Sequence, residues 1–292
     1  MVKKYSELYM DARRALLPSE GERAGALARE LLALASGQSV ERVTAHKEMY
    51  ASEEVERRLN SLVARTLDGE PLAYLLGFWP FHGLKLTITP DVLIPRDDTE
   101  VVTELAVHVL KLSPAENPRV LDLCTGSGCI GLAIASEVPD ARVTLGDVSD
   151  AALKVARQNI QSLHFTGRVK ALKLDAMEPA SAFLGKYDMI VANPPYVTET
   201  EMEQLDRSVK DYEPHLALNG GADGLDFYRA ILENYLGALQ KGGFLAFEFG
   251  QGQKEAVCAL LQERDLKIIV VKEDTGGIPR AVLAMDPRED VV

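Results

Sequence analysis

Residues 119–148, RVLDLCTGSGCIGLAIASEVPDARVTLGDV, decide how the rest of the chain is interpreted. They begin with a strand-like run, 119–124, which passes directly into a glycine-rich segment, 125–131, and then into an apolar stretch of helical length. A second strand-like run, 143–148, carries Asp147 near its end. A strand, a glycine loop, a helix and a second strand form the unit from which ligand-binding doubly wound sheets are built.

The glycine loop has the spacing of a cofactor site. Gly126, Gly128 and Gly131 satisfy G-x-G-x-x-G, and Asp147 ends the next strand, where a carboxylate can accept hydrogen bonds from ribose hydroxyls. The alternative is a tight turn that binds nothing, but strand, helix and spaced acid together favour a ligand. The loop alone does not distinguish between two candidate ligands. One is NAD, whose pyrophosphate lies on a helix N-terminus, and the other is S-adenosylmethionine, which has no phosphate.

Asp122 lies inside the strand just before the loop. It is suited to receive the amino end of the methionine part of S-adenosylmethionine. The alternative is a buried acid that is satisfied by backbone donors.

A second motif, Asn193-Pro194-Pro195-Tyr196, follows the strand-like run 188–193. Ligands of doubly wound sheets bind at the carboxyl ends of strands, which is where this motif falls. Asn193 precedes proline and is therefore held extended, and the prolines provide carbonyl acceptors without N–H donors. Tyr196 offers a flat face to a planar substrate.

These four residues predict methylation of an amide or an exocyclic amine. Both nitrogens are weak nucleophiles because their lone pair is delocalised. The Asn193 side-chain oxygen and the Pro194 carbonyl can each accept one hydrogen of an NH2 group and so aim its nitrogen at a methyl donor. No strong base is required, and S-adenosylmethionine is favoured over NAD. The alternative is an Asn-Pro turn without a chemical role.

Outside these motifs, the pattern from residue 96 alternates between strands and helices. The seven strand candidates are 119–124, 143–148, 169–174, 188–193, 244–249, 267–272 and 281–286. They predict an α/β fold with a doubly wound, Rossmann-like, mostly parallel sheet at 96–292. Residues 1–70 predict a small all-α domain, and the Gly-, Pro- and aromatic-rich stretch 71–95 predicts a connector with a β-hairpin.

Within the helical domain, two serines are candidate helix caps. Ser19 with Glu22 has the spacing of a capping box ahead of an apolar stripe that stops at Gly37. Ser52 precedes Glu53 and a helix that ends at 68–69.

Composition argues against several classes of function. The net charge of −12 counts against a nucleic-acid partner and suits a basic protein partner. The three cysteines and five histidines lack the spacings of a metal site. No run has the ~20 apolar residues that would cross a bilayer, and the N-terminus predicts an amphipathic helix rather than a signal peptide. We expect a metal-free, cytoplasmic monomer.

The chain resembles the PrmC/HemK glutamine methyltransferases. The Asn-Pro-Pro-Tyr motif is shared with DNA adenine-N6 methyltransferases, but other stretches resemble the glutamine enzymes specifically. These stretches are 69–77, 91–100, 122–128, 212–231, 242–253 and 277–284.

The resemblance implies a class I methyltransferase sheet whose last strand is antiparallel. It also implies transfer of a methyl group from S-adenosylmethionine, leaving S-adenosylhomocysteine, to the N5 amide nitrogen of the glutamine in the Gly-Gly-Gln motif of class 1 peptide-chain release factors. The helical domain would then dock the substrate protein.

The resemblance also assigns site residues by position. The cofactor residues would be Asp122, Cys124, Thr125, Gly126, Ser127, Gly128, Asp147, Asp175, Ala176 and Asn193. The substrate amide would be held by Asn193, Pro194, Pro195 and Tyr196, of which Asn193, Pro194 and Tyr196 are the catalytic set. Arg96, Thr99 and Glu100 would brace the site.

Two positions depart from the family pattern. Cys124 stands where the family loop usually has glycine, so the backbone there must tolerate a Cβ atom. Ala176 stands where many members have an aromatic residue beside the adenine.

Three alternatives to release-factor methylation remain. One is a DNA adenine-N6 methyltransferase, which needs a basic DNA-reading region. The others are a non-enzymatic nucleotide-binding module and methylation of another protein's glutamine.

Overall fold

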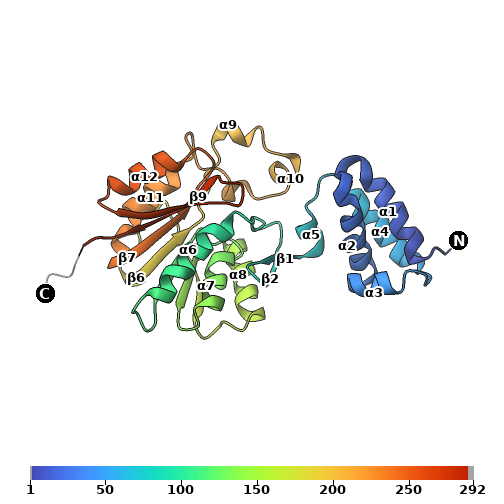
Figure 1. Cartoon of the computed structure of the whole chain (residues 1–292), viewed down its shortest axis with the longest axis horizontal. Helices are drawn as coiled ribbons and strands as arrows, with labels where there is room; N and C mark the ends of the chain where they lie inside the picture. The colour runs from blue at the N-terminus through green and yellow to red at the C-terminus, as the bar shows by residue number, and fades with distance from the viewer. Residues whose placement is uncertain (1, 289–292) are drawn as a thin grey trace. The chain divides into compact units, whose positions relative to one another are not determined.

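The computed structural model describes residues 2–288, which form two compact units with the division between Gly77 and Phe78. The first unit is helical and the second is built on a seven-stranded sheet (Figure 1). The fold class predicted from the sequence, an α/β sheet with a small N-terminal all-α domain, is confirmed.

The first unit consists of short helices around a core of leucine and alanine. Its elements are α1 (Tyr5–Glu20), the 3₁₀ turn η1 (Gly21–Arg23), α2 (Ala24–Ser36), α3 (Val40–Ala45), α4 (Glu53–Leu67) and α5 (Leu72–Leu76). Leu8, Leu16, Leu31 and Leu59 are each no more than 1% exposed and belong to one cluster of buried side chains. The apolar stripes seen in the sequence therefore face one another.

The caps of these helices agree only in part with the sequence pattern. As predicted, Ser52 caps α4, by accepting a hydrogen bond from the Val55 N–H, and α2 stops at Gly37. Gly37 has the left-handed conformation. The capping box at Ser19 is wrong, because Ser19 lies inside the last turn of α1 and its hydroxyl donates to the Leu16 carbonyl. Gly21 then ends α1 with a φ of 53°.

The structure divides the expected connector, 71–95, between the two units. Helix α5 belongs to the first unit, where Leu75 joins the helical core. The hairpin of β1 (Phe78–Phe81) and β2 (Leu84–Thr87) belongs to the second unit. There the Asn159 side chain accepts from the Thr87 N–H at 2.7 Å and donates to the Thr87 carbonyl at 3.1 Å.

The sheet of the second unit has the strand order β5-β4-β3-β6-β7-β9-β8. Its strands are β3 (Arg119–Leu123), β4 (Arg142–Asp147), β5 (Val169–Lys173), β6 (Tyr187–Ala192), β7 (Leu239–Glu248), β8 (Lys267–Glu273) and β9 (Pro279–Met285). Strands β3 to β7 run parallel, and β9 is antiparallel to both of its neighbours. Seven strands with an antiparallel last strand were predicted and are confirmed.

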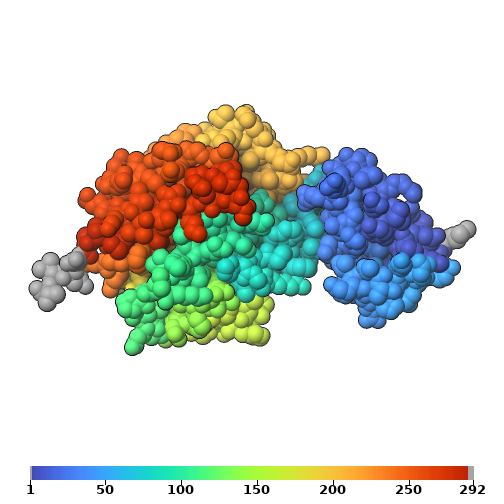
Figure 2. Space-filling view, viewed as in Figure 1, coloured from blue at the N-terminus to red at the C-terminus, as the bar shows by residue number. Residues whose placement is uncertain are grey.

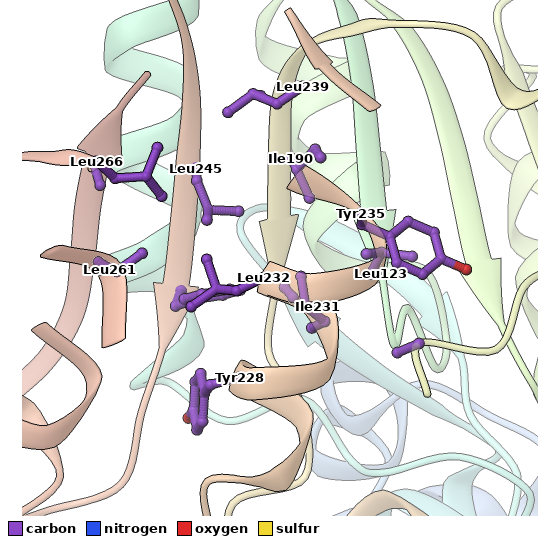
Figure 3. Close-up of a cluster of buried hydrophobic side chains, with 14 of the residues drawn as sticks. Leu123, Ile190, Tyr228, Ile231, Leu232, Tyr235, Leu239, Leu245, Leu261 and Leu266 are labelled. Carbon is purple, nitrogen blue, oxygen red and sulfur yellow. The ribbon is translucent and has the colours of Figure 1, made fainter. Parts of the chain in front are cut away.

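Helices cover both faces of the sheet (Figure 1). One face carries α6 (Thr99–Leu112), α7 (Cys129–Glu137) and α8 (Asp150–Ser162), and the other carries α11 (Asp226–Asn234) and α12 (Lys254–Gln262). Figure 3 shows Tyr228, Ile231 and Leu232 of α11 among Ile190 and Leu245 of the central strands. Because both faces are buried, the central strands are almost continuously apolar.

The remaining helical segments are short. They are η2 (Ala182–Leu184), α9 (Glu199–Met202), α10 (Arg207–Lys210), η3 (His215–Ala217) and η4 (Leu236–Ala238). Helices α9 and α10 lie on the surface of the unit, in gold in Figure 2. No helix among the described residues is both long and apolar enough to cross a membrane.

Candidate active site

A pocket lies at the carboxyl ends of four adjacent parallel strands. Loops that follow β3, β4, β5 and β6 meet there, since these strands are neighbours in the sheet. Strands β4 and β5 lie on one side of β3, whereas β6 lies on the other, so this edge contains the switch point of the sheet. Leu123 pairs with Ala192, so Cys124 and Asn193 leave the sheet side by side.

Both motifs found in the sequence therefore reach one pocket. From the predicted cofactor set, its walls include Cys124, Thr125, Gly126, Ser127, Asp147, Asp175, Ala176 and Asn193, and from the predicted substrate set they include Asn193 and Pro195. Asp122, Gly128, Pro194 and Tyr196 lie outside the walls. They contact residues that form them or adjoin them in the chain.

The glycine loop is held by two carboxylates. Asp147 accepts hydrogen bonds from the Gly126 N–H and the Ser149 N–H, both at 2.9 Å. Asp122 accepts from the Thr125 hydroxyl at 2.5 Å and from the Gly131 N–H at 3.0 Å. The loop is thereby fixed at its start, at Thr125 and Gly126, and at its end, at Gly131.

Burial governs the charge of both acids. Asp122 is 0% exposed, and desolvation raises its pKa to about 7 against the opposing effect of its two hydrogen bonds. Desolvation also raises the pKa of Asp147, although backbone donors at Ser149 and Gly126 oppose this. The Oδ1 atom of Asp122 is buried and has no hydrogen-bond partner, so one acceptor remains available beneath the loop.

The glycines meet two different requirements. Gly126 has a φ of 55°, a conformation that side chains disfavour. Gly131 has no room for a side chain, because a Cβ atom would lie 2.2 Å from Leu145 Cδ2. The first requirement concerns the turn and the second the packing of α7 on the sheet.

Cys124 occupies a glycine-like position, as expected from the departure in the sequence. Its φ is 57°, in the left-handed region. Burial and the nearby Asp147 charge raise the pKa of its thiol well above the usual value, so the thiol stays protonated. Cys124 therefore lines the pocket without the reactivity of a thiolate.

The predicted bracing residues have identified partners. Asn193 donates from Nδ2 to the Thr99 hydroxyl at 3.2 Å. Arg96 forms an ion pair with buried Glu213, whose other oxygen accepts from the Ile94 N–H at 3.1 Å. Glu100 accepts from the His82 N–H in the turn of the β1–β2 hairpin at 2.9 Å.

The loop 218–224 packs against the backbone of the Asn-Pro-Pro-Tyr motif. Val197 donates to the Leu218 carbonyl at 2.9 Å, and Gly220 donates to the Val197 carbonyl at 2.8 Å. A Cβ atom on Gly220 would lie 2.7 Å from both the Pro195 carbonyl oxygen and the Tyr196 Cα atom. Gln253 adds a hydrogen bond to the Tyr196 carbonyl at 3.0 Å.

Sequence reasoning missed much of the apolar lining of the pocket. The missed residues are Val92, Leu93, Pro95, Ile130, Val148, Ala152, Leu174, Pro214, Leu216, Ala217 and Phe227. Several of them lie in the stretches 91–100 and 212–231, whose resemblance to the glutamine enzymes was the available signal. Phe227 is the aromatic residue of the pocket walls, whereas Ala176 is 5% exposed and contributes no ring.

The described residues contain no group of three or more histidine, cysteine, aspartate or glutamate side chains suited to a metal ion.

Comparisons with known proteins agree with this arrangement. Residues 95–222 match the methyltransferase small domain family, and residues 7–77 match the PrmC N-terminal domain family. The catalytic domain of hMettl16, solved with a MAT2A 3'UTR hairpin, is similar in fold, with a TM-score of 0.56 at 15% identity over 84% of this chain and 87% of that one.

Sequence relatives are closer. The release factor glutamine methyltransferase of Thermodesulfovibrio yellowstonii is 40% identical over 77% of this chain and 80% of its own length. That of Bradyrhizobium diazoefficiens is 38% identical over 88% of this chain and 86% of its own length. The chain belongs to the family of release factor glutamine methyltransferases, a family of S-adenosylmethionine-dependent enzymes.

Proposed function

We propose that this protein transfers a methyl group from S-adenosylmethionine to the N5 amide nitrogen of the glutamine in the Gly-Gly-Gln motif of class 1 peptide-chain release factors. The observation that carries the proposal is the position of Asn193, which leaves β6 next to the glycine loop that leaves β3. An amide-binding motif and a cofactor loop thus share one pocket. The relatives named release factor glutamine methyltransferase support this choice of substrate.

The residues of the pocket suit S-adenosylmethionine. Asp147 offers carboxylate oxygens to the ribose hydroxyls, and Ile130, Val148 and Leu174 offer apolar walls to the adenine. Asp122 lies outside the pocket walls, so its buried carboxyl group would favour the cationic amino group of the methionine by charge, through the loop that it holds, rather than by contact. No phosphate is required, and the cofactor supplies the electrophilic methyl group on a sulfonium.

The chemical task of the protein is to orient a weak nucleophile. Asn193 Oδ1 and the Pro194 carbonyl would each accept one hydrogen of the glutamine NH2 group, which fixes the direction of its nitrogen. Both acceptors also stabilise the positive charge that grows on the nitrogen as the N–C bond forms. One amide proton is lost to solvent to complete the reaction.

Tyr196 has a supporting position. Its hydroxyl donates to Glu248 Oε1 at 3.4 Å, and burial raises the pKa of this hydroxyl, so it stays protonated. We propose that Tyr196 fixes the backbone of the motif and closes the substrate end of the pocket.

We propose that the helical unit docks the release factor, since its own cluster of buried side chains contains none of the cofactor residues. The net charge of −12 suits a basic protein partner and disfavours DNA. A cytoplasmic monomer that uses no metal remains our prediction.

The test is incubation with methyl-labelled S-adenosylmethionine and, separately, a class 1 release factor or duplex DNA. We expect label on the glutamine of the Gly-Gly-Gln motif and none on a release factor whose motif glutamine is replaced by alanine. Label on adenine N6 would instead identify a DNA enzyme. Label on a different glutamine would retain the chemistry and refute the substrate.

A further inference from the structure

The side chain of Asn159 connects three segments of the sheet unit. Asn159 belongs to α8 and is 0% exposed. Its Oδ1 atom accepts from the Thr87 N–H at 2.7 Å, and its Nδ2 atom donates to the Thr87 carbonyl at 3.1 Å and to the Ser127 carbonyl at 2.9 Å. A helix, the β1–β2 hairpin and the glycine loop therefore meet at one buried amide.

Backbone groups use the full donor capacity of this amide. A primary amide has two N–H donors, and in Asn159 both are directed at carbonyls, whereas the oxygen accepts. A flipped amide would set its oxygen against the two carbonyls and its NH2 group against the Thr87 N–H. Because the side chain is buried, solvent does not compete, and the three bonds hold the amide in one orientation.

The bond to Ser127 holds the one part of the loop that the two carboxylates do not. Ser127 is 2% exposed and stands between Gly126 and Gly128, whose φ angles are 55° and 87°. A residue between two glycines has little backbone restraint of its own. The Gly128 N–H donates to the Thr125 carbonyl at 2.8 Å, so the peptide that joins Ser127 to Gly128 is held on one side by Thr125 and on the other by Asn159.

The bonds to Thr87 connect the loop to a second wall of the pocket. Thr87 ends β2 and lies four positions before Asp91, where the chain begins to line the pocket. Ser127 lines the same pocket. If Asn159 only completed the edge of the hairpin, its two bonds to Thr87 would be sufficient. Its third bond fixes the glycine loop against the segment that leads into the wall at 91–95.

We propose that Asn159 is a positioning residue for S-adenosylmethionine, which acts through Ser127 on the glycine loop and through Thr87 on the segment 91–95. This inference rests on the proposed cofactor. Asn159 is not part of the pocket walls and would not touch the cofactor. It sets the fraction of molecules whose loop is ready to bind, and the apparent Kd rises as that fraction falls.

Titration calorimetry of the full chain with S-adenosylmethionine tests the inference. Asn159→Leu keeps the volume of the side chain and removes all three bonds. We expect its Kd to be about 10-fold higher than that of the wild type, which corresponds to a binding-competent fraction of about one tenth. Asn159→Ala leaves space for a water molecule that bonds to the same carbonyls, so its Kd should rise less, by about threefold to fivefold.

Gln158→Ala is the matched control, because Gln158 is the exposed neighbour of Asn159 on the same helix. Its Kd should stay within about twofold of the wild-type value. A Kd for Asn159→Leu within the same twofold range would overturn the inference, as would an equal rise in the control.

Two readouts separate positioning from a general structural role. Amide hydrogen exchange should become faster in Asn159→Leu within 84–95 and 123–131 and stay unchanged in β7 and β9. The single-turnover rate of methyl transfer should stay within about twofold once S-adenosylmethionine is saturating, because the bound cofactor selects the competent loop. Faster exchange throughout the sheet, or a lower rate at saturation, would show that Asn159 supports the fold in general and would refute the positioning role.

The design keeps this inference apart from the proposed function. Wild-type binding, measured first, tests the cofactor, and its absence would overturn both. A wild type that binds S-adenosylmethionine while Asn159→Leu and Asn159→Ala keep its Kd would refute only the role of Asn159. If thermal unfolding shows that the leucine variant does not fold, Asn159→Ala carries the same test against Gln158→Ala.

Discussion

The backbone N–H of Gly126 donates to the Oδ2 atom of Asp147 at 2.9 Å, which ties the glycine loop after β3 to the end of β4. The other carboxylate oxygen accepts from the Ser149 N–H, so both oxygens of Asp147 already have a backbone partner. Each oxygen retains acceptor capacity, because a carboxylate accepts about four hydrogen bonds. Asp147 can therefore fix the loop and accept ribose hydroxyls at once.

Asp147→Ala should weaken S-adenosylmethionine binding by about 1–3 kcal/mol, the cost of leaving hydroxyls and a backbone N–H without a charged acceptor. Asp147→Asn keeps one acceptor oxygen and should lie between alanine and wild type. Titration calorimetry gives the Kd, with Asp150→Ala as a control, because the Asp150 side chain is 73% exposed and outside the pocket. An unchanged Kd for Asp147→Ala would place the ribose elsewhere.

Much of the sheet was predictable because its strands are apolar on both faces. The run 188–193 became β6, Tyr187–Ala192, and Asn193 followed it at the edge where strand order switches. The glycine spacing likewise placed Asp147 beside the loop, since parallel neighbouring strands end together. Local sequence and overall fold agree at these residues.

Other features depend on contacts that a local pattern does not contain. Ser19 has the spacing of a cap, yet α1 runs past it to Glu20. Phe227 lines the pocket and follows a loop that packs on the Asn-Pro-Pro-Tyr backbone through Gly220, a contact between segments that no local pattern contains. Glu248 ends a strand in FLAFEF and gave no signal by itself, because the hydroxyl that donates to it belongs to Tyr196, 52 positions away in the chain.

At position 124 we expect the glycine variant to be more stable than the alanine variant, which reverses the usual order. Both Cys124→Ala and Cys124→Gly remove the thiol, but only alanine keeps a Cβ atom at a φ of 57°. We expect the glycine variant to have the larger free energy of unfolding, by about 1 kcal/mol. At Cys258, inside α12, the same pair should show the opposite order by about 1 kcal/mol. Urea unfolding measures both, and an alanine advantage at position 124 would contradict the strain.

Gly220→Ala should reduce turnover without touching the cofactor loop. Its Cβ atom would lie 2.7 Å from the Pro195 carbonyl oxygen, so the motif backbone must shift. A displacement of this kind at a reacting centre costs up to about 100-fold in rate. Gly237→Ala is the matched control, because nothing lies within 4 Å of the added Cβ atom there. Equal single-turnover rates for the two variants would mean that the motif tolerates the shift.

Asn193→Ala should slow methyl transfer by roughly 10²–10³, the range for losing one preorganised polar group at a reacting centre, with cofactor affinity nearly intact. Without this acceptor the amide rotates and its nitrogen spends less time aimed at the methyl group. Asn193→Asp keeps an acceptor but adds charge, so its rate should lie between those of alanine and wild type. Single-turnover rates check this order. If Asn193→Ala methylated release factor at nearly the wild-type rate, the motif would be only a structural turn.

Asp122 should make the protein less stable as the pH rises from about 4 to about 7. Its pKa is about 7 in the folded chain because of burial, against about 3.9 when unfolded. Across this window the folded state binds more protons than the unfolded state, so the free energy of unfolding falls with increasing pH. Between pH 5 and pH 8 the contribution of this residue is about 2–3 kcal/mol.

Asp122→Asn removes the titration while keeping the shape of the side chain. We expect the fall in unfolding free energy between pH 5 and pH 8 to be smaller in the variant by about 2–3 kcal/mol. Part of the fall should remain, because burial also raises the pKa of Glu248 to about 7. Urea unfolding without cofactor, in matched buffers, compares the two slopes, because bound cofactor would add its own stabilisation. The slope is informative even if asparagine loses the hydrogen bond from Thr125, because that loss lowers the free energy of unfolding by the same amount at pH 5 and at pH 8. Identical slopes would show that Asp122 is ionised in the folded protein across this range, and that its contacts with Thr125 and Gly131 outweigh its burial.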